Sequence, residues 1–296
     1  MGQEAKVTLG GDNPSTRNSE IFSDLKNSLQ TRSARIGVIG LGYVGLPLIT
    51  AVTKADFTGI GFDIDETKIK NISNGVSHVG AVPDETLSNL VRTAKLTATT
   101  HYGLLSNCDV IVIAVPTPLT DNRDPDLSYI ENTAEVISQN LRPGQLIILE
   151  STTYPGTMED VMKPILEKSG FIYNEDFFLA YSPEREDPGN KDFGTSQIPK
   201  VVGADSPEGL ELAECFYSKF VDKVVPVSSC RTAESVKLLE NIFRSVNIAL
   251  VNELKIIFDK MDVDIWEVIE AAKTKPFGFM PFYPGPGLGG HCIPID

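Results

Sequence analysis

Cysteine is scarce in this sequence: four of the 296 residues are Cys, and no two of them form a CxxC pair. They are Cys108, Cys215, Cys230 and Cys292. Structural zinc sites and redox dithiols need closely spaced thiols, so we expect neither, and no metal. Long apolar runs are absent too, because Asn, Asp or Lys interrupts the longest candidates before the roughly 20 residues that span a bilayer. The sequence therefore predicts no membrane segment.

Positive charge is in deficit: 26 Lys and Arg face 40 Asp and Glu, which gives a formal net charge of −14. Such a surface repels nucleic acid and anionic membranes, so neither is expected as a partner. A local cluster of donors can still bind a small anion. The composition, 41% hydrophobic and 22% charged, is that of an ordinary globular protein. The length indicates one large domain with part of a second.

Residues 1–33 lack the apolar centre of a secretory signal peptide. They are polar and rich in Gly, Asn and Ser, which predicts a disordered leader with a short helix around Ile21–Leu29. With no targeting signal, we expect a cytoplasmic protein whose thiols stay reduced.

From residue 34 to residue 230, short β-rich runs alternate with stretches of helical periodicity. The predicted strands are Arg35–Ile39, Gly59–Asp63, Leu96–Thr99, Val110–Val115, Leu146–Glu150, Phe177–Tyr181, Lys200–Gly203 and Lys223–Val227. Strands that are apolar throughout and alternate with helices are typical of a parallel sheet covered on both faces. We therefore predict an α/β domain over 34–230, built on a doubly wound parallel sheet.

One long helix is predicted from Thr232 to Met261, where no Gly or Pro occurs. Its apolar stripe is wider than one face, which indicates burial between layers or against another subunit. A second helix, Ile265–Ala272, completes a helical region over 231–275. We expect a homodimer formed through the 232–261 helix. The sequence ends in a Gly/Pro-rich loop over 276–296, so we expect that a further domain is missing.

A glycine-rich motif follows the first predicted strand and opens a helix: Gly40-Leu41-Gly42-Tyr43-Val44-Gly45. Alone the pattern is weak, but here a strand precedes it, a helix follows it, and Asp63 ends the next strand, which is typical of a dinucleotide site. Gly40 permits the tight turn, and Gly42 lets a pyrophosphate approach the helix N-terminus. The alternative is a plain strand–turn–helix.

The choice of dinucleotide follows from the acids near this motif. Asp63 would accept hydrogen bonds from the adenosine ribose, and Asp65 and Glu66 would repel a 2′-phosphate, so NAD is favoured over NADP. Two segments at strand ends should also border the cofactor cleft, unless they serve as turns alone. They are Val115-Pro116-Thr117-Pro118 and Glu150-Ser151-Thr152-Thr153.

The chemistry is predicted in the last loop, where Cys292 follows four glycines within Gly285–Gly290. A loop of this kind exposes a thiol, whereas an inert Cys usually lies in an apolar element. On the long helix Lys237 and Asn241 are four residues apart, hence on one face, and could aim donors at an oxyanion. The alternative for this pair is a solvated polar stripe.

The order of these motifs resembles nucleotide-sugar 6-dehydrogenases, the UDP-glucose/GDP-mannose dehydrogenase family. The matching segments are Gly40–Gly45, Asp63, Val115–Pro118, Glu150–Thr153, Tyr181–Arg185, Lys237–Asn241 and Gly285–Asp296. The resemblance implies a Rossmann domain and a central helix, followed in the family by a second, nucleotide-binding domain that this chain lacks. It also implies an NAD-dependent, two-step oxidation of the C6 alcohol of a UDP-sugar to a carboxylate.

The resemblance assigns a role to each matching residue. Cys292 adds to the aldehyde to give a thiohemiacetal and then a thioester, which water hydrolyses. The supporting roles fall to Lys237 and Asn241 for the oxyanion, to Thr152 and Asp296 for ordered water, and to Glu184 for hydrolysis. Pro188 stands where glucose-acting members often carry a second Glu. This departure points away from UDP-glucose, and the segments 181–189, 247–254 and 273–278 most resemble members that act on N-acetylated UDP-hexosamines. The resemblance thus implies UDP-N-acetylglucosamine as the leading substrate, then UDP-N-acetylmannosamine, then UDP-glucose, and a product that would feed bacterial surface polysaccharides.

Two other readings stay open at this point. The first is a one-step dehydrogenase of the hydroxyacid class, which shares the Rossmann domain and central helix and needs no thiol. The second is a truncated, non-catalytic chain that binds NAD and dimerises through the long helix.

Overall fold

A computed structural model describes residues 14–120, 122, 125–185 and 197–287. It divides into two compact units, one of residues 1–117 with 127–234 and one of residues 118–126 with 235–296. Within the described ranges, no helix is both long and apolar enough to cross a membrane.

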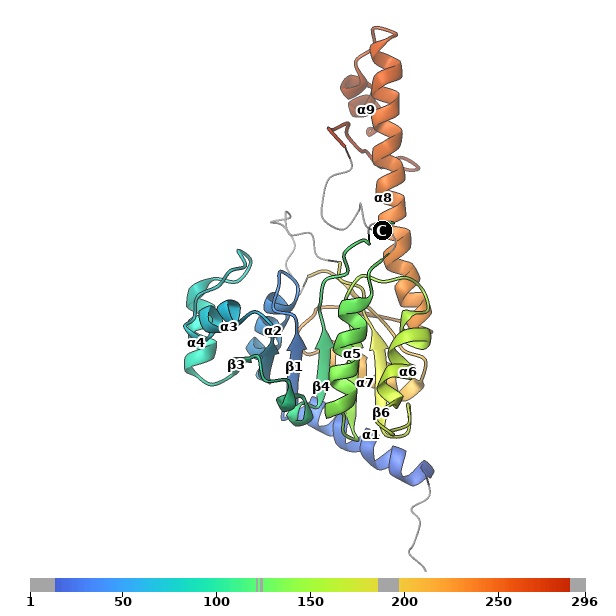
Figure 1. The fold of residues 1–296 in the computed structure, drawn as a ribbon. Coiled ribbons are helices and arrows are strands. Elements are labelled where there is room, and N and C mark those ends of the chain that lie inside the picture. Colours follow the sequence, from blue (N-terminus) through green and yellow to red (C-terminus); the bar gives the residue numbers. More distant parts are fainter. Residues whose placement is uncertain (1–13, 121, 123–124, 186–196, 288–296) are drawn as a thin grey trace, which may run out of the picture. The chain divides into compact units, whose positions relative to one another are not determined.

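In its described part, the first unit contains an eight-stranded sheet (Figure 1). The strands are β1 Arg35–Ile39, β2 Thr58–Phe62, β3 Leu96–Thr99, β4 Val110–Ile113, β5 Gln145–Leu149, β6 Phe177–Tyr181, β7 Lys200–Gly203 and β8 Val224–Val227. Their order in the sheet is β3-β2-β1-β4-β5-β6-β7-β8. The predicted α/β fold and doubly wound order are confirmed, and each predicted strand is found, with ends within two residues.

The prediction of an all-parallel sheet is wrong at one pairing. β6 and β7 are antiparallel, joined at Tyr181 and Gly203, whereas the other neighbouring strands are parallel. No helix is assigned between β6 and β7 in the described part of the chain, and an antiparallel neighbour needs no crossover helix.

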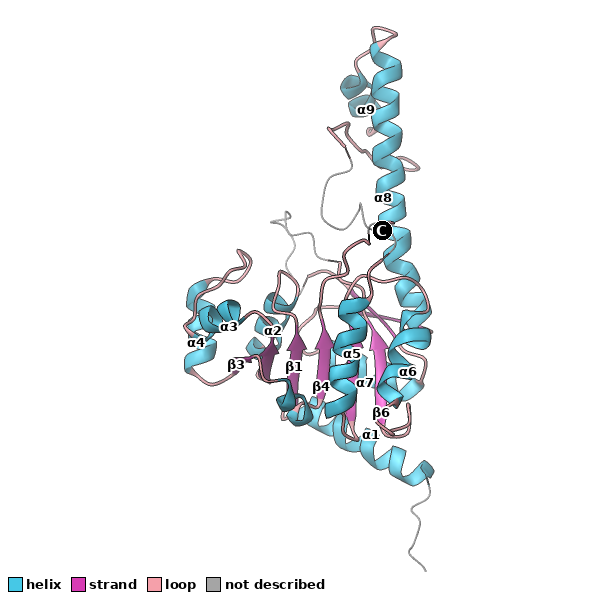
Figure 2. Cartoon of the chain, viewed as in Figure 1, coloured by secondary structure: helices cyan, strands magenta, loops and turns pink. Residues whose placement is uncertain are grey.

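Helices cover both faces of the sheet (Figure 2). They are α2 Gly45–Lys54, α3 Glu66–Ser73, α4 Asp84–Arg92, α5 Ser128–Asn140, α6 Lys163–Glu167 and α7 Pro207–Tyr217, with a 3-10 turn Tyr102–Asn107 and a π turn Met158–Met162. Successive side chains of β4, Val110 to Ile113, point to opposite faces and are all fully buried. This continuous burial explains why the strands are apolar throughout rather than alternating.

Residues 14–31 form helix α1, Pro14–Thr31. The short helix predicted around Ile21–Leu29 is therefore confirmed, and the expectation of disorder is wrong for the rest of this stretch. Leu25 and Leu29 are buried in the main core, and the Phe22 ring lies 6.4 Å from the ring of Phe178 in β6. Apolar residues at three- and four-residue steps give this helix a face to bury, although its composition is polar. Residues 1–13 lie outside the described residues.

The second unit contains most of α8, Cys230–Asp259, together with α9, Ile265–Ala272. Its small core joins Val251 to Ile265 and Ile269. The α9 prediction is confirmed, and α8 begins and ends two residues earlier than predicted. Much of the apolar stripe of α8 is exposed in the single chain: Leu239, Ile242, Phe243, Val246, Leu250, Ile256 and Ile257.

Candidate functional site

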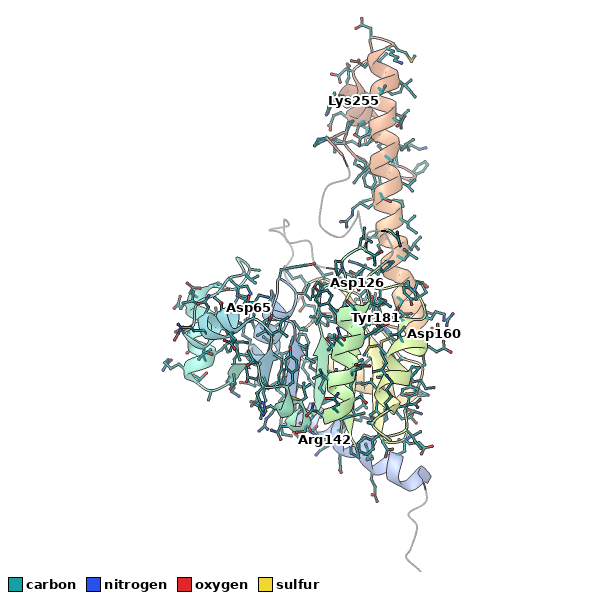
Figure 3. All side chains as sticks on the ribbon, viewed as in Figure 1. Asp65, Asp126, Arg142, Asp160, Tyr181 and Lys255 are labelled. Atoms are coloured by element: carbon teal, nitrogen blue, oxygen red, sulfur yellow. The ribbon has the colours of Figure 1, made fainter. Side chains whose placement is uncertain are left out.

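The predicted site residues of the first unit follow the carboxyl ends of adjacent strands. The glycine motif follows β1, Asp63 follows β2, Val115–Thr117 follow β4, Ser151–Thr152 follow β5 and Glu184 follows β6. These five strands are parallel neighbours, so their carboxyl ends share one edge of the sheet. Figure 3 shows Asp65 and Tyr181 toward this edge and Arg142, before β5, at the opposite one. Ligands in such sheets bind at this edge, where the strand order reverses between β1 and β4.

The glycine motif has the geometry that its three glycines predict. Gly40 has φ +89°, and its N–H donates to the Phe62 carbonyl at 2.8 Å. A Cβ on Gly45 would lie 1.8 Å from the Gly40 carbonyl oxygen, so any side chain there collides with backbone. A Cβ on Gly42 would meet nothing within 4 Å. The backbone is therefore closely packed at Gly40 and Gly45, whereas the space around Gly42 is open. This open space lies next to the start of α2, where a pyrophosphate can bind.

Asp63 is buried and fixes this loop. Its carboxylate accepts hydrogen bonds from the N–H groups of Leu41 at 2.9 Å and Asp65 at 3.0 Å, and Lys68 Nζ lies 3.2 Å from Oδ2. A carboxylate has about four lone-pair positions, so these three donors leave room for a ribose hydroxyl. Contact with a ribose stays a prediction.

His78 is a loop residue whose contact the sequence did not reveal. Its Nε2 donates to the Leu41 carbonyl at 2.7 Å, so both backbone groups of Leu41 are bound, one by Asp63 and one by His78. His78 lies in the loop after α3, and no local pattern in the sequence links it to residue 41. Only the packing of the two loops brings them together.

The segments after β4 and β5 are tied together, as their shared edge predicts. Ser151 Oγ donates to the Val115 carbonyl at 2.7 Å, and Thr117 Oγ1 donates to the Thr152 carbonyl at 2.8 Å. Gly40 packs beside them, because its Cβ would lie 2.5 Å from the Ala114 carbonyl oxygen. The structure thus brings the predicted cofactor residues of β1, β4 and β5 side by side.

Glu184 belongs to a network of buried polar groups that the sequence analysis missed. Lys200 Nζ lies 3.4 Å from Glu184 Oε2 and 3.0 Å from Glu150 Oε2, and the Tyr217 hydroxyl donates to Glu150. Burial raises the pKa of Glu150, while Lys200 opposes that rise. Burial, and then the Glu150 charge, raises the pKa of Tyr217. The sequence feature that could have indicated this network is Lys200, a charged residue at the start of the otherwise apolar strand β7.

The remaining predicted catalytic residues belong to the second unit or lie outside the described residues. Lys237 and Asn241 lie on α8 in the second unit, where Asn241 is buried and Lys237 is half-buried. The alternative of a solvated polar stripe is therefore wrong for Asn241, whose side chain is buried. Cys292 and Asp296 lie outside the described residues, as do residues 186–196 with Pro188.

The other three thiols are packing groups in the structure. Cys108 and Cys230 are buried and Cys215 is half-buried. Burial raises the pKa of Cys108 to about 12 and also raises the pKa values of Cys215 and Cys230. Thiols held in the protonated form are weak nucleophiles. Across the described ranges, no group of three His, Cys, Asp or Glu side chains is arranged to hold a metal ion.

Comparison with known families accounts for most of the chain. Residues 34–221 match the NAD binding domain of the UDP-glucose/GDP-mannose dehydrogenase family, and residues 231–296 match the central domain of the same family.

Individual relatives match over nearly the same stretch. A Pseudomonas aeruginosa protein named UDP-N-acetyl-D-glucosamine 6-dehydrogenase is 41% identical over 267 residues, which cover 90% of this chain and 62% of that protein. The structure of a UDP-D-ManNAc dehydrogenase from Pyrococcus horikoshii is 38% identical with a TM-score of 0.82, covering 88% of this chain and 62% of that one. The UDP-N-acetyl-mannosamine dehydrogenase Cap5O from Staphylococcus aureus is 35% identical with a TM-score of 0.80, covering 89% and 64%. The chain thus spans less than two thirds of these relatives.

Proposed function

Because the chain belongs to the UDP-glucose/GDP-mannose dehydrogenase family, whose first domain binds NAD, we propose that it oxidises the C6 alcohol of a UDP-N-acetylhexosamine to a carboxylate. The main support is one structural observation. The loop that is open above Gly42 shares a sheet edge with Thr152 and with Glu184, an acid held by a buried lysine. This arrangement supports a dinucleotide site and a general base, Glu184, at the same edge of the sheet.

Different residues of the chain act in the two oxidation steps. NAD, when bound, accepts the hydride in each. In the first oxidation the C6 hydroxyl proton passes to the water beside it, and Lys237 and Asn241 donate hydrogen bonds to the oxyanion that develops on the C6 oxygen. The Cys292 thiolate adds to the aldehyde carbon, because an aldehyde offers no suitable hydride until a nucleophile has added to it. The thiohemiacetal becomes a thioester when its hydride leaves.

Water then releases the product. Thr152 and Asp296 order the water, and the Glu184 carboxylate takes its proton as the oxygen attacks the thioester carbon. The C–S bond breaks, and the sulfur of Cys292 recovers a proton. The products are the sugar carboxylate and the free thiol, so the protein returns to its starting form.

The substrate proposal rests on both sequence and relatives. Pro188 replaces the second Glu that glucose-acting members often carry. The Pseudomonas aeruginosa relative is named for UDP-N-acetyl-D-glucosamine, and the two solved relatives for the mannosamine sugar. We rank UDP-N-acetylglucosamine first, UDP-N-acetylmannosamine second and UDP-glucose third. A uronic acid of this kind would supply surface polysaccharides made from cytoplasmic precursors.

A homodimer is part of the proposal. Leu239, Val246 and Leu250 of α8 are each more than half exposed in the single chain, and their spacing places them on one face of the helix. Apolar surface of this kind marks a protein contact. A second copy of the chain packed along α8 would remove it from water.

The stoichiometry of NADH formation tests the proposal directly. The chain, and a version joined to the C-terminal part of the Pseudomonas aeruginosa relative, are mixed with each UDP-sugar and excess NAD. We expect two NADH for each sugar consumed, fastest with UDP-N-acetylglucosamine. One NADH per sugar would instead support a one-step dehydrogenase. NAD binding with no NADH from either version would support a non-catalytic chain.

Removing the acid at the end of β2 should change the choice between cofactors. In the Asp63→Ala variant we expect NAD to bind about 10- to 100-fold more weakly, because a charged hydrogen bond contributes about 1.5–3 kcal/mol. NADP should lose less, since the repulsion of its 2′-phosphate is also removed. Fluorescence titration with both cofactors measures the ratio of the two dissociation constants. Glu175→Ala is the control, because it removes an exposed acid just before β6, at the opposite edge of the sheet. An unchanged ratio in Asp63→Ala would show that this acid is not at the ribose.

A further inference from the structure

The buried lysine beside Glu184 is unusual in its surroundings. The side chain of Lys200 is 10% exposed, and those of Glu150 and Glu184 are 0% and 16% exposed. A buried ammonium is costly unless it is paired, so Lys200 needs at least one of these carboxylates in its ionised form. The network places one cation between two acids, one of them sealed in the core and the other at the edge that carries the candidate site.

The sealed side of this network fixes the position of the ammonium. Glu150 is fully buried, accepts a hydrogen bond from the Tyr217 hydroxyl and lies 3.0 Å from Lys200 Nζ. The Lys200 ammonium also lies 5.4 Å from the centre of the Tyr217 ring, whose face attracts a cation. Together these contacts hold the lysine from within the core.

The backbone of β7 brings Lys200 level with Glu184. β7 runs antiparallel to β6 from the pair Tyr181 and Gly203, and Ser182 Oγ donates to the Val201 carbonyl at 2.8 Å. On its other side, the Lys200 N–H donates to the Lys223 carbonyl at 2.9 Å. The strand therefore cannot slide, and Nζ reaches Glu184 at 3.4 Å.

We propose that Lys200 is the positioning residue for Glu184: it keeps this carboxylate ionised and fixed for proton transfer from water, with Glu150 and Tyr217 anchoring the lysine. The inference rests on the proposed function, which gives Glu184 its role in thioester hydrolysis. In that step the carboxylate takes a proton from water, the water oxygen bonds to the thioester carbon, and the C–S bond breaks. Only an ionised Glu184 can take that proton.

Two substitutions should shift the titration of Glu184 in opposite directions. Lys200→Met removes the cation that favours the ionised form, so the titration should move up by about one pH unit or more, in line with the effect of an opposite charge within about 4–6 Å. Glu150→Gln removes a neighbouring negative charge and should move the titration down. Lys200→Arg keeps the cation and should restore the original value.

The titration is followed in the full chain without substrate, by NMR of isotope-labelled glutamate side chains, with Glu184→Gln to assign the signal. Lys168→Met is the matched control, because it removes a lysine from an exposed ion pair with Glu135. Circular dichroism and thermal melting check that each variant folds. If Lys200→Met does not fold, the downward shift in Glu150→Gln still decides the matter. If the pH at which Glu184 titrates is the same in both variants as in the wild type, the proposal is overturned.

Turnover provides the second readout and separates this inference from the function on which it rests. The rate of the second NADH should show an acid limb that moves to higher pH in Lys200→Met, with kcat reduced about tenfold at pH values on that limb and KM little changed. A shifted titration with an unshifted limb would overturn the role of Lys200 in the reaction. A wild-type protein that forms no NADH would instead reject the proposed function.

Discussion

Replacing Cys292 with alanine is expected to abolish the second oxidation, lowering its rate by about 10³-fold or more. Alanine cannot add to the aldehyde, so neither the thiohemiacetal nor the thioester forms. The first oxidation needs no thiol, so Cys292→Ala should release at most one NADH per sugar and leave the sugar at the aldehyde level. NADH absorbance gives the stoichiometry, and an aldehyde-trapping reagent identifies the stalled product.

The matched control for this variant is Cys215→Ala. Cys215 is a half-buried thiol on α7, and its pKa is raised by burial, so it is a poor nucleophile. This variant should still release two NADH per sugar. Two NADH per sugar from Cys292→Ala would exclude the covalent route and leave a dehydrogenase that works without a thiol.

Changing two glycines of the same motif to alanine should impair different properties, stability in Gly45→Ala and NAD affinity in Gly42→Ala. Gly45→Ala puts a methyl group 1.8 Å from the Gly40 carbonyl oxygen, a backbone atom that cannot swing away. We expect the free energy of unfolding to fall by about 3 kcal/mol and the melting temperature by about 10 °C. Gly42→Ala places its methyl in open space, so its stability should be unchanged, but NAD should bind at least about tenfold more weakly because the pyrophosphate needs that space.

Gly80→Ala is the control for both variants, because a Cβ at Gly80 also meets nothing within 4 Å and this loop glycine is not part of the motif. It should keep both stability and affinity. Thermal melting and NAD titration, applied to all three variants, separate the two effects. Equal affinity for NAD in Gly42→Ala and the wild type would place the dinucleotide elsewhere.

The sequence was sufficient for the strands and for the shared edge of the site. β1, β3, β6 and β7 begin and end at the predicted residues. Apart from β3, which is Leu-Thr-Ala-Thr at the edge of the sheet, they are short and largely apolar runs. Strands of a parallel sheet have this composition because both faces are covered. Once the strands are known, parallel packing alone brings the residues after β1, β2, β4, β5 and β6 together.

Other features could not be predicted from local patterns. The direction of β7 depends on how the chain returns to the sheet, and had β7 been parallel, Lys200 would have started at the edge opposite Glu184. The contact of His78 with Leu41 joins two loops that no periodicity relates. Helix α1 was predicted only around Ile21–Leu29, because the polar composition of residues 1–33 outweighed the four apolar residues that pack against the core. The roles of Cys292 and Asp296, outside the described residues, stay predictions.

The parallel sheet also has a consequence for how the chain reaches its native state. β1 lies between β2 and β4, and Ile36 pairs with Val110, far away along the chain. Pairings between such distant segments form slowly, since a long loop must close before any contact stabilises it. Until β4 docks, its run of four aliphatic residues is available to other unfolded chains. Slow synthesis at low temperature, or a chaperone that shields this strand, should therefore raise the yield of correctly folded protein.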